Sequence, residues 1–276
     1  MPLPMLRSLL FVPGSRPDRF EKAANAGSDI ICIDLEDAVM PADKAQARAS
    51  VVKYLATNNN VVVRINHILT ATGIDDLTAL INAENSPMAI MLPKTSCPTE
   101  IDQAVAIIGT KNIEIIALLE SVAGVNNSQL IAACDQVSAL MFGGADYSAE
   151  IGAEFSYEPL LLARSQLVQA KAVKAIQLID VPHIDIKQLD DLQHETAKVK
   201  ALGFTAKAAI HPCQLDAIHQ EFTPSELEVH NAEEIVSQID NEDAGVLVIN
   251  GRMIDRPIIL AAKRTIALAQ AASKNL

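Results

Sequence analysis

The sequence predicts an α/β protein: a (β/α)8 TIM barrel with a C-terminal helical extension. Eight short apolar runs alternate with longer amphipathic stretches between residues 6 and 222. Several runs lack the polar alternation of a sheet with one face in water, which is typical of parallel strands covered on both faces. Eight strand–helix units in about 220 residues suit a closed barrel, which commonly takes roughly 250.

The elements follow from these patterns in chain order. The expected strands are Leu6–Pro13, Asp29–Asp34, Val61–Asn66, Ala89–Leu92, Glu114–Leu119, Ala139–Phe142, Ala175–Ile179 and Ala208–Ile210. The expected helices are Pro17–Ala26, Pro41–Leu55, Asp75–Asn82, Pro98–Ile108, Val125–Cys134, Glu158–Lys174, Ile186–Leu202 and Cys213–Gln220. Pro17 and Pro41 suit the first turn of a helix, where a missing N–H is tolerated. Gly27 and Gly203 suit the left-handed position that follows a helix.

A doubly wound open sheet is the alternative fold. Such sheets normally have fewer units and a glycine-rich first turn, whereas the first turn here reads PGSRPDRF and contains no GxGxxG. The barrel is therefore favoured.

The pattern changes after Phe222. Thr223-Pro224-Ser225-Glu226 resembles a helix start, and a helix to about Ile239 is expected. A loop over 241–244, a strand over Val246–Asn250 and a last helix over Pro257–Ala272 complete the chain. We therefore expect a barrel over residues 1–222 and a lid or oligomerisation segment over residues 223–276.

Composition excludes several classes of partner. The net charge is −12, aromatic residues make up 3% and Trp is absent, which argues against a nucleic-acid surface. No apolar run reaches the ~20 residues that cross a bilayer, and no signal-peptide pattern opens the chain, so a cytoplasmic protein is expected. Four cysteines lack metal or CxxC spacing and are expected to be free, mostly buried thiols.

A polar side chain follows nearly every expected strand, at the barrel end where enzymes of this fold carry their chemistry. In order these are Arg16, the run Asp34–Asp37, Arg64 with Asn66, Lys94, Glu120, Asp146, Asp180 and His211. His211, in a His-Pro pair, is expected to shape the last turn rather than to transfer a proton.

Glu120 and Asp146 follow neighbouring strands. Two carboxylates without a histidine suit a hard cation that keeps several waters, Mg²⁺ rather than Zn²⁺. The alternative is a carboxylate pair bonded to helix N-termini or to a nearby arginine. Arg64 ends the apolar run VVVRIN, and a guanidinium there needs an acidic partner or an anionic ligand. A structural ion pair with Glu36 or Asp37 is the alternative.

Seven sequence blocks, in order along nearly the whole chain, match one family together. They are RSLLFVPGSRPDRFEKAANAGSDIICIDLEDAVMPADKAQAR, VVVRIN, IMLPK, LLES, LMFGGADY, GFTAKAAIHPCQ and NGRMID. The chain resembles the citrate lyase β-subunit-like (HpcH/HpaI aldolase) family, which includes malyl-CoA and citramalyl-CoA lyases. The resemblance implies a Mg²⁺-dependent barrel lyase, a homotrimer or hexamer, that cleaves a 3-hydroxyacyl thioester to an acyl thioester and an α-keto acid.

The resemblance also implies roles for individual residues. Glu120 and Asp146 would hold the metal, and Arg64 would bind substrate together with Glu120 and act in catalysis. The remaining roles are coenzyme A contacts for Phe11, Arg16 and Lys22, supporting positions for Glu36 and Asp37, and a catalytic carboxylate, Asp255, that reaches a neighbouring subunit's site. Ala145 and Asn250 stand where relatives carry acidic residues.

The function that the resemblance implies is cleavage of citramalyl-CoA to acetyl-CoA and pyruvate, with malyl-CoA as the next candidate substrate. A citrate lyase β subunit that acts on an acyl-carrier-protein thioester is a second reading, and binding of free coenzyme A would discriminate against it. A catalytically idle assembly subunit is a third reading. It would bind Mg²⁺ normally and cleave no thioester.

Overall fold

The computed structural model describes residues 3–238, 247–249 and 252–274. The chain divides into two compact units, residues 1–219 and 220–276. Each unit is described separately below.

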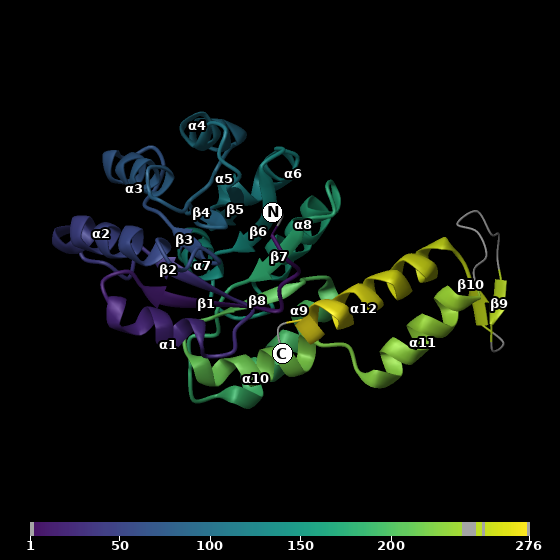
Figure 1. Ribbon diagram of the computed structural model, residues 1–276. Helices are drawn as coiled ribbons and strands as arrows, with labels where there is room; N and C mark the ends of the chain where they lie inside the picture. The colour runs from purple at the N-terminus through teal and green to yellow at the C-terminus, as the bar shows by residue number, and fades with distance from the viewer. Residues whose placement is uncertain (1–2, 239–246, 250–251, 275–276) are drawn as a thin grey trace. The chain divides into compact units, whose positions relative to one another are not determined.

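The first unit is a closed barrel of eight parallel strands, each hydrogen-bonded to the next, with the last strand pairing with the first. The strands are β1 (Ser8–Pro13), β2 (Ile30–Asp34), β3 (Val62–Arg64), β4 (Ala89–Leu92), β5 (Glu114–Leu119), β6 (Val137–Phe142), β7 (Gln177–Asp180) and β8 (Ala206–Ala209). Figure 1 shows these strands at the centre of the unit with helices around them. The predicted (β/α)8 barrel is confirmed.

Helices follow the strands. They are α1 (Phe20–Ala24), α2 (Lys44–Leu55), α3 (Ala71–Ile81), α4 (Pro98–Ile108), α5 (Val122–Asn126), α6 (Ser128–Ala132), α7 (Gly144–Ile151), α8 (Leu161–Ala172), α9 (Leu189–Leu202) and α10 (Leu215–Phe222). Short 3₁₀ turns η1 (Pro17–Arg19), η2 (Pro41–Asp43) and η3 (Pro212–Gln214) lead into α1, α2 and α10. Gly27 and Gly203 have φ angles of 91° and 120°, as the left-handed positions require.

Burial explains the apolar runs. Every residue of β2 is buried, so the strand is covered on both faces. Leu9, Cys32, Met91, Met141 and Ala208 belong to one buried core cluster formed by the strands. Because the strands are parallel, their carboxyl ends lie at one rim, and the chemistry-bearing side chains that follow them meet there.

Several elements differ from the sequence-based expectation. The helix expected over Val125–Cys134 is two short helices, α5 and α6, and Ser121 starts α5 early because its hydroxyl accepts a hydrogen bond from Gly124 N. Strand β7 begins later than expected, after Ala175, whose φ is +54°. Helix α7 was missed: its glycine-rich start resembles a plain turn, yet it places Asp146 in a first helical turn.

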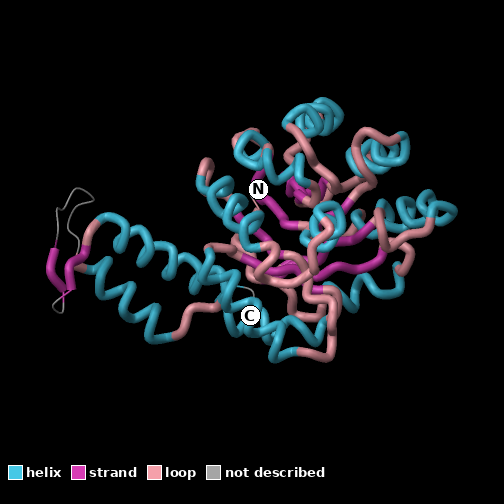
Figure 2. The backbone as a smooth tube through the Cα atoms, turned by 180° about the vertical axis from the view of Figure 1, so that it is seen from behind, coloured by secondary structure: helices cyan, strands magenta, loops and turns pink. Residues whose placement is uncertain are grey.

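The second unit contains α11 (Glu226–Ser237), the hairpin strands β9 (Leu247–Ile249) and β10 (Arg252–Ile254), and α12 (Arg256–Lys274). Ser225 caps α11, since its side chain accepts from Glu228 N while Glu228 bonds back to Ser225 N. Ile235, Ile254 and Ile259 pack together, and Figure 2 shows α11 and α12 side by side. Strand β10 was not expected. The expected loop over 241–244 and Asn250 lie outside the described residues.

The cysteines are free, as expected, but not mostly buried. Only Cys32 is buried, whereas Cys97 and Cys134 are half-buried and Cys213 is exposed. None of the helices that the structure describes is both long enough and apolar enough to traverse a lipid bilayer. The role of residues 223–276 as a lid or oligomerisation segment stays a prediction.

Candidate active site

A cavity of about 420 Å³ opens at the carboxyl ends of the barrel strands. Its lining includes Phe11, Asp34, Asp37, Arg64, Glu120 and Asp146. Five of these six are sequence-predicted site residues that come from separate strand ends. The structure therefore brings together the arginine and both expected metal ligands in one cavity.

Arg64 ends β3 and is held by three carboxylates. Its Nε and Nη2 donate to Asp34 Oδ1 and Oδ2, each at 2.7 Å. Its Nη1 lies 3.2 Å from Glu36 Oε2 and 3.5 Å from Asp37 Oδ2. Burial alone would lower the pKa of Arg64, but the hydrogen bonds and charge of Asp34 raise it well above its ordinary value, so the guanidinium stays charged.

Glu120 follows β5 and is 7% exposed. Its Oε1 accepts a 2.7 Å hydrogen bond from the backbone N–H of Lys94, whose left-handed φ of 56° accompanies this contact. Burial first, and then the charges of Glu36 and Asp146, raise the pKa of Glu120 to about 8. A nearby divalent cation would offset both the desolvation and the repulsion.

Gly143 is required where the chain passes Glu120. A Cβ at residue 143 would lie 2.3 Å from Glu120 Cβ and 2.8 Å from Glu120 Oε2, which is closer than atoms can approach. Two residues into α7, Asp146 is exposed and lines the same cavity. Asp146 is near enough for its charge to raise the pKa of Glu120.

The donor set fits a hard cation. Among the residues that the structure describes, no three His, Cys, Asp or Glu side chains are grouped to hold a metal ion. Glu120 and Asp146 both line the cavity and offer only carboxylate oxygens as donors. One or two carboxylates with several waters is the arrangement that Mg²⁺ adopts in proteins.

Sequence reasoning noted Asp34 and Lys94 at strand ends but gave neither a role in the site. The ion pair considered for Arg64, with Glu36 or Asp37, is present, but Asp34 is the main partner. Lys94 Nζ donates to Glu36 Oε1 at 2.8 Å, and burial raises the pKa of Glu36 despite this contact. The positions of Asp34 and Lys94 at strand ends were visible, but their partners depend on which strands are neighbours.

A second, larger cavity of about 760 Å³ adjoins the first. The two share Phe11, Val12, Pro13 and Ile210. The second cavity is lined by three cations, Arg16, Arg19 and Lys22, of which Arg19 was not expected. Arg16 forms two exposed hydrogen bonds to Asp18, at 2.8 and 2.7 Å.

His211 also lines the second cavity. His211 caps the last turn of the barrel, because its side chain accepts from Cys213 N, which is the structural role expected. Asp255 belongs to the second unit, between β10 and α12, where its backbone oxygen accepts from Ile259 N. Its catalytic role stays a prediction.

The closed parallel barrel with a charged rim places the protein in the TIM-barrel class. The model of one family, described as HpcH/HpaI aldolase/citrate lyase, matches residues 7–212. The chain belongs to this family, which confirms the family expected from the sequence blocks.

Several curated proteins are similar over nearly the whole chain. Citrate lyase subunit beta of Leuconostoc mesenteroides subsp. cremoris is 30% identical, covering 96% of this chain and 93% of the relative. The human protein named citramalyl-CoA lyase, mitochondrial, is 30% identical over 95% of this chain and 85% of its own. The L-malyl-CoA/beta-methylmalyl-CoA lyase of Cereibacter sphaeroides is 30% identical, at 96% and 94% coverage.

A solved structure is also similar. The protein CitE from Mycobacterium tuberculosis, in complex with magnesium, acetoacetate and coenzyme A, superposes with a TM-score of 0.79 and 29% identity. The match covers 95% of this chain and 97% of that chain. The likeness therefore extends over both units of the sequence.

Proposed function

We propose that the protein is a Mg²⁺-dependent lyase that cleaves a 3-hydroxyacyl-CoA thioester to acetyl-CoA and an α-keto acid, with citramalyl-CoA and malyl-CoA as the candidate substrates. Its class as a carbon–carbon lyase follows from the family and from similar proteins that are named lyases. The observation that carries the rest is one cavity lined by Arg64, Glu120 and Asp146 that shares lining residues with a cationic one.

Glu120 and Asp146 would hold the magnesium ion. The pair supplies only oxygen donors, and the raised pKa of Glu120 indicates a carboxylate that needs a positive charge nearby. Magnesium is also present in the similar CitE structure. When bound, Mg²⁺ would act as a Lewis acid and as a template for the substrate's carboxylate and hydroxyl group.

Arg64 would stabilise the negative charge that develops on oxygen while the carbon–carbon bond breaks. A donor placed in advance for such a charge is often worth about 3 kcal/mol. Asp34 fixes the plane of the guanidinium through its two hydrogen bonds. The Arg64 Nη1 group, whose contacts are longer, is the part of the guanidinium best able to donate to a ligand.

Asp255 would take the proton of the 3-hydroxyl group. Loss of this proton lets the hydroxyl group become the carbonyl of the keto acid. The electrons of the broken carbon–carbon bond pass into the enolate of the thioester. The C-terminal segment would carry Asp255 into a neighbouring subunit's site, which requires an oligomer, and a homotrimer or hexamer is the one expected. Mixing inactive Asp255→Asn and Glu120→Gln proteins tests this, because shared sites would restore part of the activity.

The cationic cavity would hold coenzyme A. Arg16, Arg19 and Lys22 offer positive charge to its phosphates, against the net charge of −12 of the whole chain. Phe11 lies between the two cavities, with its ring centroid 5.1 Å from Arg64 Cζ. A thioester that spans both cavities would place its reacting bond near Arg64.

Two alternatives are less well supported. A citrate lyase β subunit that acts on a carrier-protein thioester is not favoured, because the three-cation cavity beside the site suits a free coenzyme. An idle assembly subunit is not favoured either, because the chain keeps the residues that the reaction would use.

The direct test is an assay of purified protein with Mg²⁺ and citramalyl-, malyl- and β-methylmalyl-CoA, identifying the keto acid released. Activity that disappears with EDTA and returns with Mg²⁺ is expected. A protein that binds Mg²⁺ and cleaves none of the three would contradict the proposal.

A further inference from the structure

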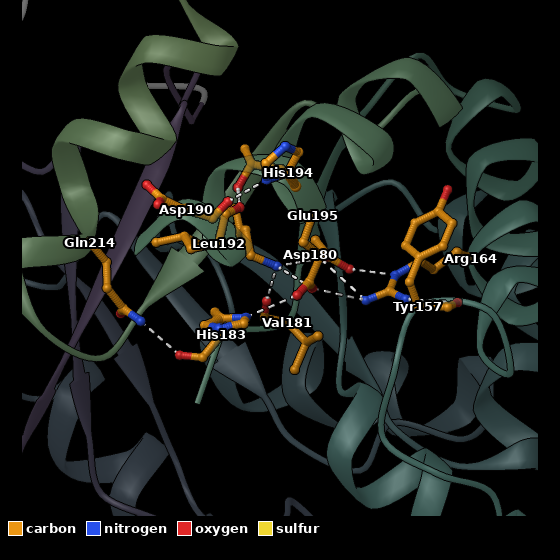
Figure 3. Close-up of polar contacts among 12 residues, drawn as sticks. Tyr157, Arg164, Asp180, Val181, His183, Asp190, Leu192, His194, Glu195 and Gln214 are labelled. Carbon is orange, nitrogen blue, oxygen red and sulfur yellow. Dashed lines mark hydrogen bonds and ion pairs between the residues drawn. The ribbon is translucent and has the colours of Figure 1, made fainter. Parts of the chain in front are cut away.

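A buried cluster of charges lies just beyond the active-site cavity. Lys207 on β8 and Asp180 on β7 are both 0% exposed, and Lys207 Nζ donates to Asp180 Oδ2 at 2.6 Å. Arg164 on α8, 1% exposed, donates to the other Asp180 oxygen at 3.0 Å. Glu195 on α9 accepts from Lys207 at 2.9 Å and bonds to His183 Nδ1 at 3.0 Å. Figure 3 shows these contacts.

The cluster fastens the loop that follows β7. Lys207 Nζ also donates to the carbonyl oxygen of Val181, at 2.7 Å. The carbonyl oxygen of His183, two residues after Val181, accepts a hydrogen bond from Gln214 Nε2 at 2.7 Å. Gln214 is fully buried, and its Oε1 accepts from Ile210 N at 2.9 Å. The loop over 181–183 is therefore held at both ends, by Lys207 on β8 and by Gln214 in the turn η3 that follows β8.

This loop is a wall of the active-site cavity. Val181 and Pro182 both line the cavity, and Val181 is 4% exposed. In Figure 3 the Val181 side chain points away from the charged groups. A wall anchored by paired, buried charges is rigid, because displacing any member would leave a buried charge without its partner.

The wall stands on the apolar side of the cavity. The charged lining residues follow β2, β3, β5 and β6, whereas the loops after β7 and β8 contribute Val181, Pro182 and Ile210. Ile210 also lines the adjoining cationic cavity. A bound thioester would have its keto-acid part at the charged residues and its coenzyme in the cationic cavity. The α-carbon of its acyl group would then lie between them, along this wall.

We propose, resting on the proposed function, that Val181 and Pro182 determine which acyl chain the lyase accepts, and that Lys207 is the positioning residue that holds them in place.

Three thioesters differ in whether and where they carry a methyl group at the reacting carbons, so comparing them shows which carbon lies against the wall. Malyl-CoA has no methyl group at either reacting carbon. β-Methylmalyl-CoA has one at the α-carbon of the thioester, and citramalyl-CoA has one at the carbinol carbon. Because one methyl in a pocket changes discrimination by roughly tenfold or more, ratios of kcat/KM between these substrates report where each methyl lies. Ratios also cancel the effect of partial unfolding.

The first test enlarges and reduces the wall. Val181→Ala is expected to raise the β-methylmalyl to malyl ratio of kcat/KM by about tenfold, and Val181→Leu to lower it by about tenfold. The citramalyl to malyl ratio is expected to change by less than about twofold in both. If wild-type protein cleaves these thioesters and neither variant moves the first ratio, the specificity assignment is wrong and the proposed function stands.

The second test concerns Lys207. Lys207→Met is expected to shift the β-methylmalyl to malyl ratio by at least about threefold, since the wall loses its anchor. Lys198→Met is the matched control: Lys198 lies on the same helix as Glu195 but pairs with exposed Glu158. If Lys207→Met lowers the unfolding temperature but leaves the ratio unchanged, Lys207 has a purely structural role and is not a positioning residue.

Two further outcomes, an unfolded variant and an inactive wild-type protein, are also decisive. If Lys207→Met does not fold, the Val181 variants decide the specificity assignment by themselves. If wild-type protein cleaves none of the three thioesters, the proposed function fails and this assignment fails with it.

Discussion

Arg64 and Asp34 lie opposite each other on adjacent strands and are joined by two parallel hydrogen bonds of 2.7 Å. Asp34 is fixed in turn, because Oδ1 accepts from Glu36 N and Oδ2 from Ala38 N, both at 2.9 Å. The loop after β2 therefore sets the plane of the guanidinium before any ligand arrives. Preorganisation of this kind is what transition-state stabilisation requires.

The planar guanidinium should matter more than its charge. Arg64→Lys keeps the charge but cannot form the two parallel bonds, so kcat/KM is expected to fall about 100-fold. Arg48→Lys is the matched control, because Arg48 bonds to buried Asp76 at 2.6 Å but does not line the cavity. It should lose stability, measured by urea unfolding, and retain kcat/KM. Wild-type kcat/KM in Arg64→Lys would contradict this role.

Gly143→Ala should damage the carboxylate pair directly. The new Cβ would meet Glu120 Cβ at 2.3 Å, so Glu120 must move and the affinity for Mg²⁺ should fall at least about tenfold. Calorimetric titration of the protein with Mg²⁺ measures this. Gly109→Ala is the control: at φ +63° with nothing within 4 Å, it should lose stability and bind Mg²⁺ normally. Equal affinities in the two variants would refute the prediction.

His219 should make the barrel less stable in mild acid. Its Nε2 lies 2.7 Å from Ser8 Oγ, and burial first, then the charge of Arg7, lower its pKa below 6.5. As the pH falls through that value, the unfolded chain takes up a proton that the folded protein resists. The contribution of His219 to the free energy of unfolding is therefore constant well above pH 6.5 and decreases below it.

Urea unfolding at about pH 7.5 and pH 5.5 checks this. His219→Gln should show the smaller loss on acidification, because it no longer titrates. Exposed His230→Gln should behave as wild type. The same pH dependence in His219→Gln and wild type would show that another group is responsible.

Lys22 should contribute to coenzyme A binding through charge. Lys22→Glu is expected to weaken binding of free coenzyme A about threefold to tenfold at low salt, and the difference should shrink as salt is added. Asp18→Asn should strengthen binding, because it releases Arg16 from its ion pair. Lys53→Glu, exposed on α2 and away from the cavity, is the control. A salt-independent effect of Lys22→Glu would argue against phosphate contact.

Local patterns were enough to predict the barrel, because strands that are buried on both faces, such as β2, are continuous apolar runs in the sequence. They were also enough to place Glu120, Asp146 and Arg64 at one rim, since the ends of parallel strands coincide. The main partner of Arg64 was not predictable. The register of β2 and β3 places Asp34 directly opposite Arg64, so Asp34, rather than Glu36 or Asp37, is its main partner. Register is a property of the closed sheet and leaves no mark on either strand alone.

The contact between Lys94 and Glu120 was hidden for a related reason. The interaction uses the backbone N–H of Lys94, which every residue except proline possesses, so no residue type signals it. Helix α7 was missed because Gly143 and Gly144 weaken the helical pattern at its start. The structure explains Gly143 by the space that Glu120 occupies.

The central claim is that Glu120 and Asp146 together hold one divalent ion. Titration of metal-free protein with Mn²⁺, followed by electron paramagnetic resonance, measures the number of ions bound and their affinity. We expect one ion per chain, an affinity reduced more than about 100-fold in both Glu120→Gln and Asp146→Asn, and a much smaller change in Asp37→Asn. Wild-type stoichiometry and affinity in either Glu120→Gln or Asp146→Asn would contradict the account.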